Sequence, residues 1–166
     1  AIIKFVIEAG IAKSNSVVDI AQLEAAVREE LNYTAVRGMA VVDPIKVIVT
    51  NFDKDVEWLE VDINPEQMEL GKRKVPFTRE LYIEKDDFSL NPPKGYRRLF
   101  VGNEVRFKGA YYLKCEDYKL DDKGEVTEVY CTYDETTRGG WTSDGRKVKG
   151  TIQWISTEHA LPSEFR

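Results

Sequence analysis

The residues with the clearest chemical potential lie in the segment 94–114, which concentrates positive charge. This segment holds six basic residues and one acidic residue, whereas the whole chain has 24 basic and 29 acidic residues and a net charge of −5. The segment therefore carries +5 and the remainder of the chain −10. An acidic protein that gathers its positive charge in one short stretch is suited to bind an anion there.

The dipeptide Gly102-Asn103 lies between two runs of aromatic and β-branched residues within this segment. Both residues tolerate positive φ, so the pattern predicts a β-hairpin with a two-residue turn. Side chains alternate along a strand, and the predicted pairing places Arg97 opposite Lys108 and on one face with Arg106. The other face of the predicted hairpin holds the apolar residues Phe100, Val105 and Phe107.

Two cations directly opposite each other in a strand pair repel, so the pairing of Arg97 with Lys108 favours an anion between them. Arg98 falls on the apolar side near a strand end, where a long side chain reaches solvent. Tyr96, Tyr111 and Tyr112 add aromatic rings nearby. Cations with aromatic rings are typical of sites for single-stranded nucleic acid. The alternative is a solvated strand face whose charges keep the protein soluble.

Composition limits the possible classes of protein. The length of 166 residues fits one domain, or one domain with a small appendage. The sequence contains no run of about 18 apolar residues, so it predicts no membrane helix. Lys4 and Glu8 interrupt the apolar start that a signal peptide needs. The acidic balance argues against coating nucleic acid by bulk charge. Cys115 and Cys131, with one histidine, predict two reduced thiols in a cytosolic protein and no metal site.

No set of residues in the sequence predicts a reaction centre. His159 is the single histidine, and we interpret it as structural. The acidic pairs Asp86-Asp87 and Asp121-Asp122 fall at expected turns. Serine elbows and glycine-rich phosphate loops are missing from the sequence. The sequence therefore predicts a binding module.

The elements that would position the basic segment change type along the chain. Residues 1–9 have helical spacing and are closed by Gly10, and Asp19 is a plausible N-cap of a second helix reaching residue 32. Residues 11–18 are the expected connector. From residue 39 onward the apolar period becomes two, which predicts an antiparallel barrel or sandwich. The expected strands are 45–49, 56–63, 75–84, 104–120, 125–133 and 146–156.

Five segments of the sequence, taken in order, resemble one protein family. They are AVRGMAVVDPIKVIV, VPFTRELYIEKDDF, GNEVRFKGAYYLKCE, CTYDETTRGG and DGRKVKGTIQWIS. Together they resemble the glutaminyl-tRNA synthetase family of class I aminoacyl-tRNA synthetases, and the resemblance runs from residue 1 to residue 166. The segments are specific to the joint glutaminyl and glutamyl group, and GRKVKGTIQWIS favours the glutaminyl branch.

The resemblance implies a fold and a parent enzyme. Residues 1–36 would form a helical connecting subdomain, and residues 37–166 a closed antiparallel β-barrel that binds the anticodon. This proximal barrel resembles that of a 5S-rRNA-binding ribosomal protein. The parent would be a glutamine–tRNA ligase that uses ATP with Mg to charge tRNA-Gln. The ATP-binding signatures of HIGH and KMSKS type are absent here, so we expect an inactive fragment that needs no cofactor.

The resemblance also implies which residues contact the anticodon. The matching positions are Arg37, Arg97, Arg98, Arg106 and Lys108. Arg106 and Lys108 would serve the first anticodon base, Arg97 and Arg98 the third, and Arg37 the middle base. Lys108 stands where the family often has arginine, which removes bidentate geometry. Gly95 stands where a larger polar residue is often found.

The resemblance finally implies partners, and the sequence leaves alternatives open. The expected partners are the anticodon loop of tRNA-Gln, the parent's own catalytic domain and a distal barrel. The chain begins without Met and stops without a terminating signal, so we expect a piece of a larger cytoplasmic protein, monomeric and without membrane contact. One alternative is the same module of a glutamyl-tRNA synthetase. Others are a freestanding RNA-binding barrel and a protein-interaction barrel without RNA contact.

Overall fold

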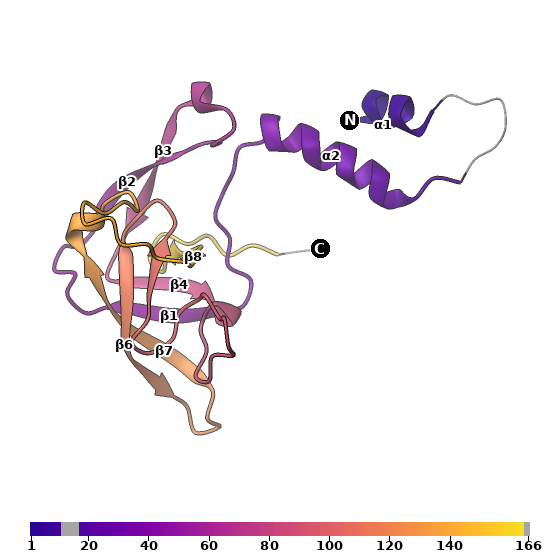
Figure 1. The fold of residues 1–166 in the computed structure, drawn as a ribbon. Helices are drawn as coiled ribbons and strands as arrows, with labels where there is room; N and C mark the ends of the chain where they lie inside the picture. Colours follow the sequence, from indigo (N-terminus) through magenta and orange to yellow (C-terminus); the bar gives the residue numbers. More distant parts are fainter. Residues whose placement is uncertain (11–16, 165–166) are drawn as a thin grey trace. The chain divides into compact units, whose positions relative to one another are not determined.

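The computed structural model describes residues 1–10 and 17–164. These residues form two compact units (Figure 1). The first unit comprises Ala1–Gly38 and Asp62–Lys72, and the second comprises Met39–Val61 and Arg73–Arg166. Most of the connector predicted at 11–18 lies outside the described residues.

The first unit contains the two predicted helices, α1 (Ile2–Ala9) and α2 (Ile20–Thr34). Gly10 ends α1 with φ 82°, a conformation that glycine adopts without strain. Asp19 caps α2, because its carboxylate accepts a hydrogen bond from the Ala21 amide at 2.9 Å. Both helix predictions are therefore confirmed.

Asn64 closes the other end of α2 within the same unit. It lies in the stretch before the short 3-10 helix η1 (Met68–Leu70) and is fully buried. Its side-chain amide donates to the carbonyls of Asn32, Tyr33 and Ala35, at 2.9, 3.2 and 3.1 Å. Carbonyls at the end of a helix lack partners inside the helix, so this side chain supplies a donor to groups that the helix itself leaves unpaired.

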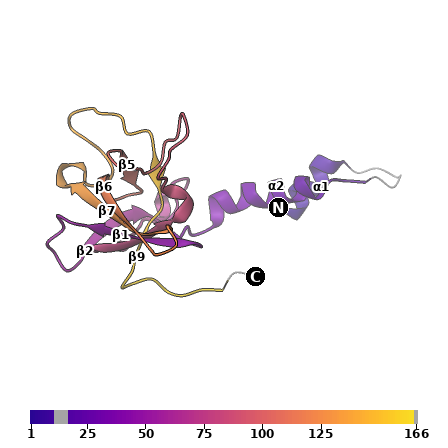
Figure 2. The same cartoon turned by 90° about the horizontal axis from the view of Figure 1, so that it is seen from below.

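The second unit is built on one curled seven-stranded sheet, seen from two sides in Figures 1 and 2. Its strand order is β8-β5-β6-β7-β1-β4-β9. β1 runs parallel to β7 and β5 parallel to β8, and the other neighbours are antiparallel. The strands of this sheet are β1 (Pro44–Val49), β4 (Glu80–Glu84), β5 (Glu104–Phe107), β6 (Tyr112–Leu120), β7 (Val126–Asp134), β8 (Thr151–Ile152) and β9 (Ile155–Ser156).

The two edges of this sheet are close in sequence. Only Gln153 and Trp154 separate β8 at one edge from β9 at the other, so the sheet has to curl to bring its edges together. A separate two-stranded sheet pairs β2 (Glu57–Asp62) with β3 (Lys72–Phe77). The remaining elements are the short 3-10 helices η2 (Lys85–Asp87) and η3 (Glu135–Thr137).

Aromatic residues fill the core inside the curled sheet. The Phe77 ring meets the rings of Phe52, Tyr111 and Trp154 edge-on, with centroids 5.2 to 5.3 Å apart. Such edge-to-face contacts add to the free energy gained by burying the rings. Trp154 is fully buried and donates its ring N–H to the Lys108 carbonyl at 3.0 Å, which ties the linker between β8 and β9 to the end of β5.

The predicted hairpin at Gly102-Asn103 is wrong. The chain does turn there, and the Asn103 amide donates to the Phe100 carbonyl at 2.9 Å. However, residues 94–103 form no strand with β5, and Leu99 makes only an isolated parallel bridge to Phe88. β5 instead pairs with β6 on one side and with β8 on the other. Arg97 therefore does not lie opposite Lys108.

Three other predicted strands are divided in the structure. The expected strand 104–120 breaks into β5 and β6 at a turn containing Gly109, whose φ is 70°. The expected strand 75–84 becomes β3 and β4, and the expected strand 146–156 becomes a segment without regular structure followed by β8 and β9. The predictions of strands near 45–49, 56–63 and 125–133 are confirmed, as is the mainly β fold with a small helical N-terminal part.

Candidate nucleic-acid interface

The basic segment 94–103 is held in place by the residue at its centre. Leu99 is fully buried, its amide donates to the Asp87 carbonyl at 2.9 Å, and its carbonyl accepts from Ser89 at 3.0 Å. Arg98, just before it, forms an ion pair with the buried Asp87 carboxylate. Burial raises the pKa of Asp87, and the nearby guanidinium opposes that rise only in part. Arg97 extends to solvent without an ion pair to a described residue.

A second basic segment, 146–150, lies against the first. Arg146 anchors it with two hydrogen bonds to the Glu104 carboxylate, both 3.0 Å long, and further ion pairs with Asp134 and Asp144. Its guanidinium also lies 5.4 Å from the centre of the Tyr112 ring. These carboxylates raise the pKa of Arg146, Glu104 contributing most. We call this set of contacts the Arg146 anchor.

The carboxylates of the anchor respond in turn. Hydrogen bonds from Thr142 and from the backbone and side chain of Arg146 lower the pKa of Asp144 to about 2. Thr136 and then Arg146 lower the pKa of Asp134 in the same way. Both carboxylates are therefore charged at neutral pH. Asp134 ties the segment to β7, as Glu104 ties it to β5, whereas Asp144 pairs with Arg146 within the loop itself.

Gly150 brings the two basic segments into direct contact. A Cβ atom at this position would lie 1.8 Å from the Arg97 carbonyl oxygen, so only glycine permits the approach. The Gly150 carbonyl accepts a hydrogen bond from the Arg106 amide at 2.9 Å. Residue 150 thus contacts the backbones of both Arg97 and β5.

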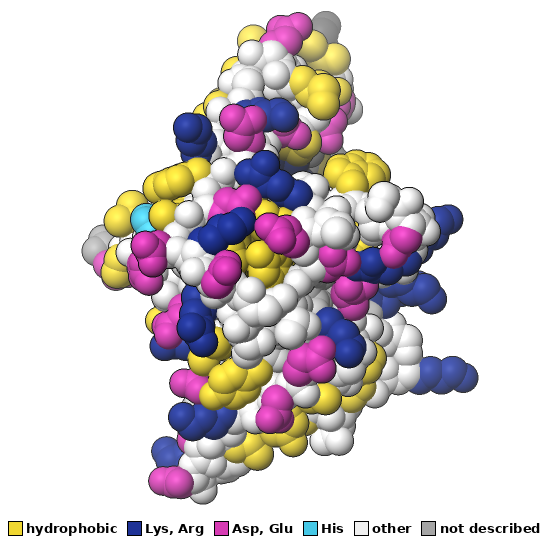
Figure 3. Space-filling model, turned by 90° about the vertical axis from the view of Figure 1, so that its left-hand side faces the viewer, with side chains coloured by type: hydrophobic (Ala, Val, Ile, Leu, Met, Phe, Trp, Pro, Cys, Tyr) yellow, Lys and Arg dark blue, Asp and Glu magenta, His cyan; other side chains and the backbone are white. Residues whose placement is uncertain are grey.

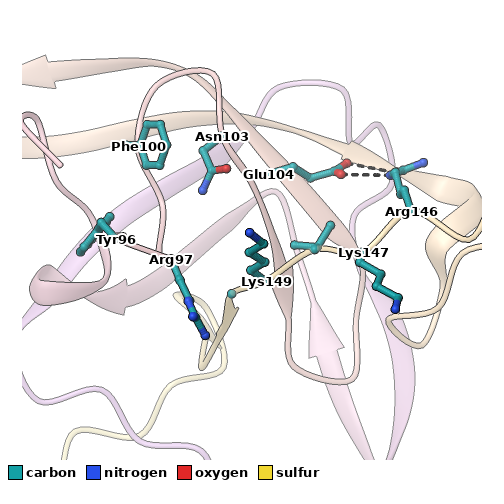
Figure 4. Close-up of a pocket in the computed structure, with 10 residues that line it drawn as sticks. Tyr96, Arg97, Phe100, Asn103, Glu104, Arg146, Lys147 and Lys149 are labelled. Atoms are coloured by element: carbon teal, nitrogen blue, oxygen red, sulfur yellow. Dashed lines mark hydrogen bonds and ion pairs between the residues drawn. The ribbon is translucent and has the colours of Figure 1, made fainter. Parts of the chain in front are cut away.

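Two cavities open where the segments meet. The first, of about 290 Å³, is shown in Figure 4, where Tyr96, Arg97 and Phe100 line one side and Arg146 and Lys147 the other. Lys149 lies between these two sides in the same view. The second cavity, of about 500 Å³, shares Arg97 and the segment Arg146–Lys149 and adds Arg106, Tyr112 and Trp141.

Four of the five cations around these cavities form no ion pair with a carboxylate of the described residues. Within the described part of the chain, no ion pair involves Arg97, Arg106, Lys147 or Lys149. Arg106 donates to the Tyr112 hydroxyl at 3.0 Å, and its guanidinium lies 5.4 Å from the centre of that ring. Cations that an internal carboxylate does not neutralise are available for an external anion. Aromatic walls beside them suit a ligand that is anionic and has flat rings, as unpaired RNA is.

The structure separates the five residues predicted to contact the anticodon into groups. Arg97 and Arg106 come together at the second cavity. Lys108 is exposed two residues beyond Arg106 and lines neither cavity. Arg98 is engaged by Asp87. Arg37 belongs to the helical unit, where its guanidinium donates to the Asn32 carbonyl at 3.0 Å.

Sequence reasoning missed Lys147, Lys149 and Trp141. A signal was present, because Arg146, Lys147 and Lys149 place three basic residues within four positions of the sequence. The 94–114 segment gives the stronger signal because it holds more basic residues, six against three. Its partner segment lies about 40 residues further along the chain, and the sequence does not show that the two meet.

Elsewhere in the described residues, little supports a metal site, a catalytic site or a membrane helix. Within 1–10 and 17–164 no cluster of three histidine, cysteine or acidic side chains could hold a metal ion. His159 shares a hydrogen bond with the nearly buried Ser156 at 3.1 Å. Cys115 and Cys131 are buried free thiols opposite each other on β6 and β7. None of the helices in these residues combines the length and apolar character that crossing a bilayer requires.

One face of the molecule carries mixed rather than concentrated charge. On the face drawn in Figure 3, basic and acidic side chains are interspersed, with acidic groups beside most basic ones. Such a face produces no strong field of one sign, so attraction of a polyanion has to come from a local cluster. Free cations beside aromatic walls define the class of this domain as one suited to bind nucleic acid.

Comparison with known proteins identifies the family. Residues 35–134 match the anticodon-binding domain of class I tRNA synthetases of the E and Q type, and the chain belongs to this family. A glutamine–tRNA ligase of Clostridium perfringens is 52% identical over 158 residues, which is 95% of this chain and 29% of that protein. A glutamine–tRNA ligase of Bradyrhizobium diazoefficiens is 51% identical over 164 residues, 98% of this chain and 29% of the relative. The chain thus spans less than a third of these relatives.

Proposed function

We propose that this chain reads the anticodon of tRNA-Gln as part of a glutamine–tRNA ligase. The observation that carries the proposal is the identity of about half over nearly the whole chain with glutamine–tRNA ligases. The free cations at the two cavities provide the physical means. Anticodon loops present unstacked bases, and proteins read these with guanidinium forks or ammonium groups next to aromatic walls.

The residues take roles that follow from the family resemblance and from their surroundings. Arg106 and Lys108 serve the first anticodon base, Arg97 and Arg98 the third, and Arg37 the middle base. Arg97 is the more direct reader of its pair, since it is not engaged by an internal carboxylate. Asp87 orients Arg98 and leaves part of its guanidinium for the RNA, because the Arg98 side chain remains 48% exposed.

The parent protein supplies the remaining parts of the reaction. Its catalytic domain uses ATP with Mg to join glutamine to tRNA-Gln in the cytoplasm. Residues 1–36 connect that domain to the anticodon reader, and residues 37–166 form the proximal barrel, closed in the manner of the 5S-rRNA-binding ribosomal protein. A distal barrel completes the anticodon site. The chain itself then needs no cofactor to bind RNA.

A binding experiment with small hairpin RNAs tests the proposal. Anticodon loops of glutamine and glutamate tRNAs differ at the third base, which is G in the first and C in the second. The wild-type chain should bind the glutamine loop more tightly than the same hairpin with C at that position. Arg97→Ala and Arg106→Ala should each lose about 1–3 kcal/mol of binding free energy and relax base preference.

Three outcomes decide between the readings of this site. Tighter binding of the glutamate loop would assign the chain to the glutamyl branch instead. Equal losses on a loop of scrambled sequence would reduce Arg97 and Arg106 to phosphate contacts. Binding of neither hairpin, in a buffer of low salt where phosphate contacts are strongest, would overturn the proposal.

A further inference from the structure

Trp141 is an exposed aromatic ring at the wall of the second cavity, outside residues 35–134 that the family pattern matches. It is 76% exposed. Single exposed apolar residues are common on protein surfaces and need no explanation by themselves. Trp141 differs because neighbouring residues hold it in position and because free cations surround the space it faces.

Arg106 makes a cation–π contact with the Trp141 ring. The Arg106 guanidinium lies 5.7 Å from the centre of the Trp141 ring and 5.4 Å from that of Tyr112, so one cation contacts two rings. Cation–π contacts of this kind stabilise and orient the ring. Gly140 permits the approach, because a Cβ atom there would lie 3.0 Å from the Arg106 side chain.

The loop that carries Trp141 is fixed at both ends. At its start, Arg138 pairs with Glu57 at 2.9 Å, and the Gly140 amide donates to the Thr137 carbonyl at 2.8 Å. At its end stands the Arg146 anchor, which binds Glu104 on β5 and Asp134 on β7. A ring held in this way loses little conformational entropy when a ligand stacks on it.

The charges around the cavity indicate what would stack on this ring. Arg97, Lys147 and Lys149 line the same cavity without an ion pair to a described residue. A ligand for this site therefore has a flat ring and negative charge on its connecting groups. Unpaired RNA has both, with the base on the indole and the phosphates near the lysines.

We propose that Trp141 is a stacking platform for an unpaired nucleobase, and that this base belongs to the RNA strand read by Arg97 and Arg106. The inference rests on the proposed function, because it takes the ligand to be an unpaired stretch of tRNA. It adds a contact that the five predicted cations do not provide. Stacking tolerates any base, so Trp141 adds affinity and positions the strand, while the arginines select bases.

Binding of two RNAs to the full 166-residue chain tests this proposal. One RNA is the glutamine anticodon hairpin and the other is an unstructured oligouridine. Trp141→Ala should weaken binding of both about five- to a hundredfold, and Trp141→Phe should retain most of the affinity, because a phenyl ring still stacks. The matched control is Trp58→Ala, since Trp58 is also exposed, packs on His159 and lines neither cavity.

The salt dependence separates stacking from a loss of loop structure. Stacking releases no counterions, so the slope of log affinity against log salt should be the same for Trp141→Ala and wild type. A shallower slope would mean that the substitution had displaced Lys147 and Lys149, and would overturn stacking as the cause. Equal losses for Trp141→Ala and Trp141→Phe would also overturn it.

Fluorescence gives an independent reading of the same contact. The chain has three tryptophans, and Trp154 is fully buried. In the Trp58→Phe variant the exposed emission comes from Trp141, and saturating RNA should quench it. Unchanged emission would overturn the platform. If the chain binds both RNAs through Trp141 but does not prefer the glutamine anticodon, the platform stands and the proposed function fails.

Discussion

The two basic segments that meet at the cavities expose their cations in the same way but are held by different forces. In each, internal carboxylates engage one arginine, Arg98 in the first and Arg146 in the second, while adjacent cations stay free. The first segment is fixed mainly by the buried Leu99. The second is fixed by ion pairs among partly exposed groups. Salt and pH should therefore affect the second segment more than the first.

The contact between the segments should be the most sensitive point. Gly150→Ala places a Cβ atom 1.8 Å from the Arg97 carbonyl oxygen, and backbone has to move to relieve it. We expect the free energy of unfolding to fall by about 3 kcal/mol or more, measured by urea denaturation. Gly38→Ala is the control, because nothing lies within 4 Å of its Cβ position. A small effect of Gly150→Ala would show that the segments do not depend on each other.

The next largest effect should separate the neighbours Arg97 and Arg98. Arg98→Ala leaves the nearly buried Asp87 carboxylate unpaired, and we expect it to lower the free energy of unfolding by about 1–3 kcal/mol. Arg97→Ala breaks no internal pair, so its effect on stability should stay within about 0.5 kcal/mol although it weakens RNA binding.

A double variant checks the cause of this difference. Asp87→Asn in the Arg98→Ala background removes the unpaired charge, so part of the lost stability should return. Equal destabilisation by Arg97→Ala and Arg98→Ala would contradict the division of the first segment into an anchoring and a reading arginine.

The Arg146 anchor should show a dependence of stability on pH that the burial of Leu99 in the first segment does not. The pKa values of Asp134 and Asp144 are lowered in the folded state, that of Asp144 to about 2. Their stabilising contribution is therefore full above the ordinary carboxyl pKa of about 3.9 and is lost as the pH falls toward 2. Arg146→Ala should cost about 1 kcal/mol at neutral pH, because the pairs are partly exposed.

Thermal unfolding across pH measures this contribution. The melting temperatures of wild type and Arg146→Ala should differ at pH 6 and converge toward pH 2. The same comparison for Leu99→Ala should show a gap with little dependence on pH, since apolar burial does not titrate. A constant gap for Arg146→Ala would mean that its packing on Tyr112, rather than its ion pairs, holds the second segment.

The sequence predicted the faces of β5 but not its neighbours. Alternation is a property of the strand itself, so Val105 and Phe107 were correctly placed inside and Arg106 outside. The pairing of residues 97–101 with β5 was wrong because β8 occupies that edge. β8 is only two residues long, and its position is set by the buried Trp154 that follows it. No local pattern reveals a contact made at that distance in sequence.

The candidate site, like the fold, was predictable only in part. Charge density in 94–114 identified Arg97 and Arg106, which the structure brings to one cavity. It could not show that Asp87 engages Arg98, because that pair joins η2 to the loop after Pro93. It also did not reveal Lys147 and Lys149, whose importance comes from Gly150 lying against Arg97.

The smallest expected effect concerns the two lysines of the second segment. Lys147→Ala and Lys149→Ala should each leave the free energy of unfolding unchanged within about 0.5 kcal/mol, since no internal partner is lost. Each should lower the slope of log affinity against log salt by about 1 if it contacts a phosphate. Lys123→Ala, in an exposed turn that lines neither cavity, should leave the slope unchanged. A slope that falls equally in all three variants would assign the attraction to net charge, and the second segment would then anchor the site without contacting RNA.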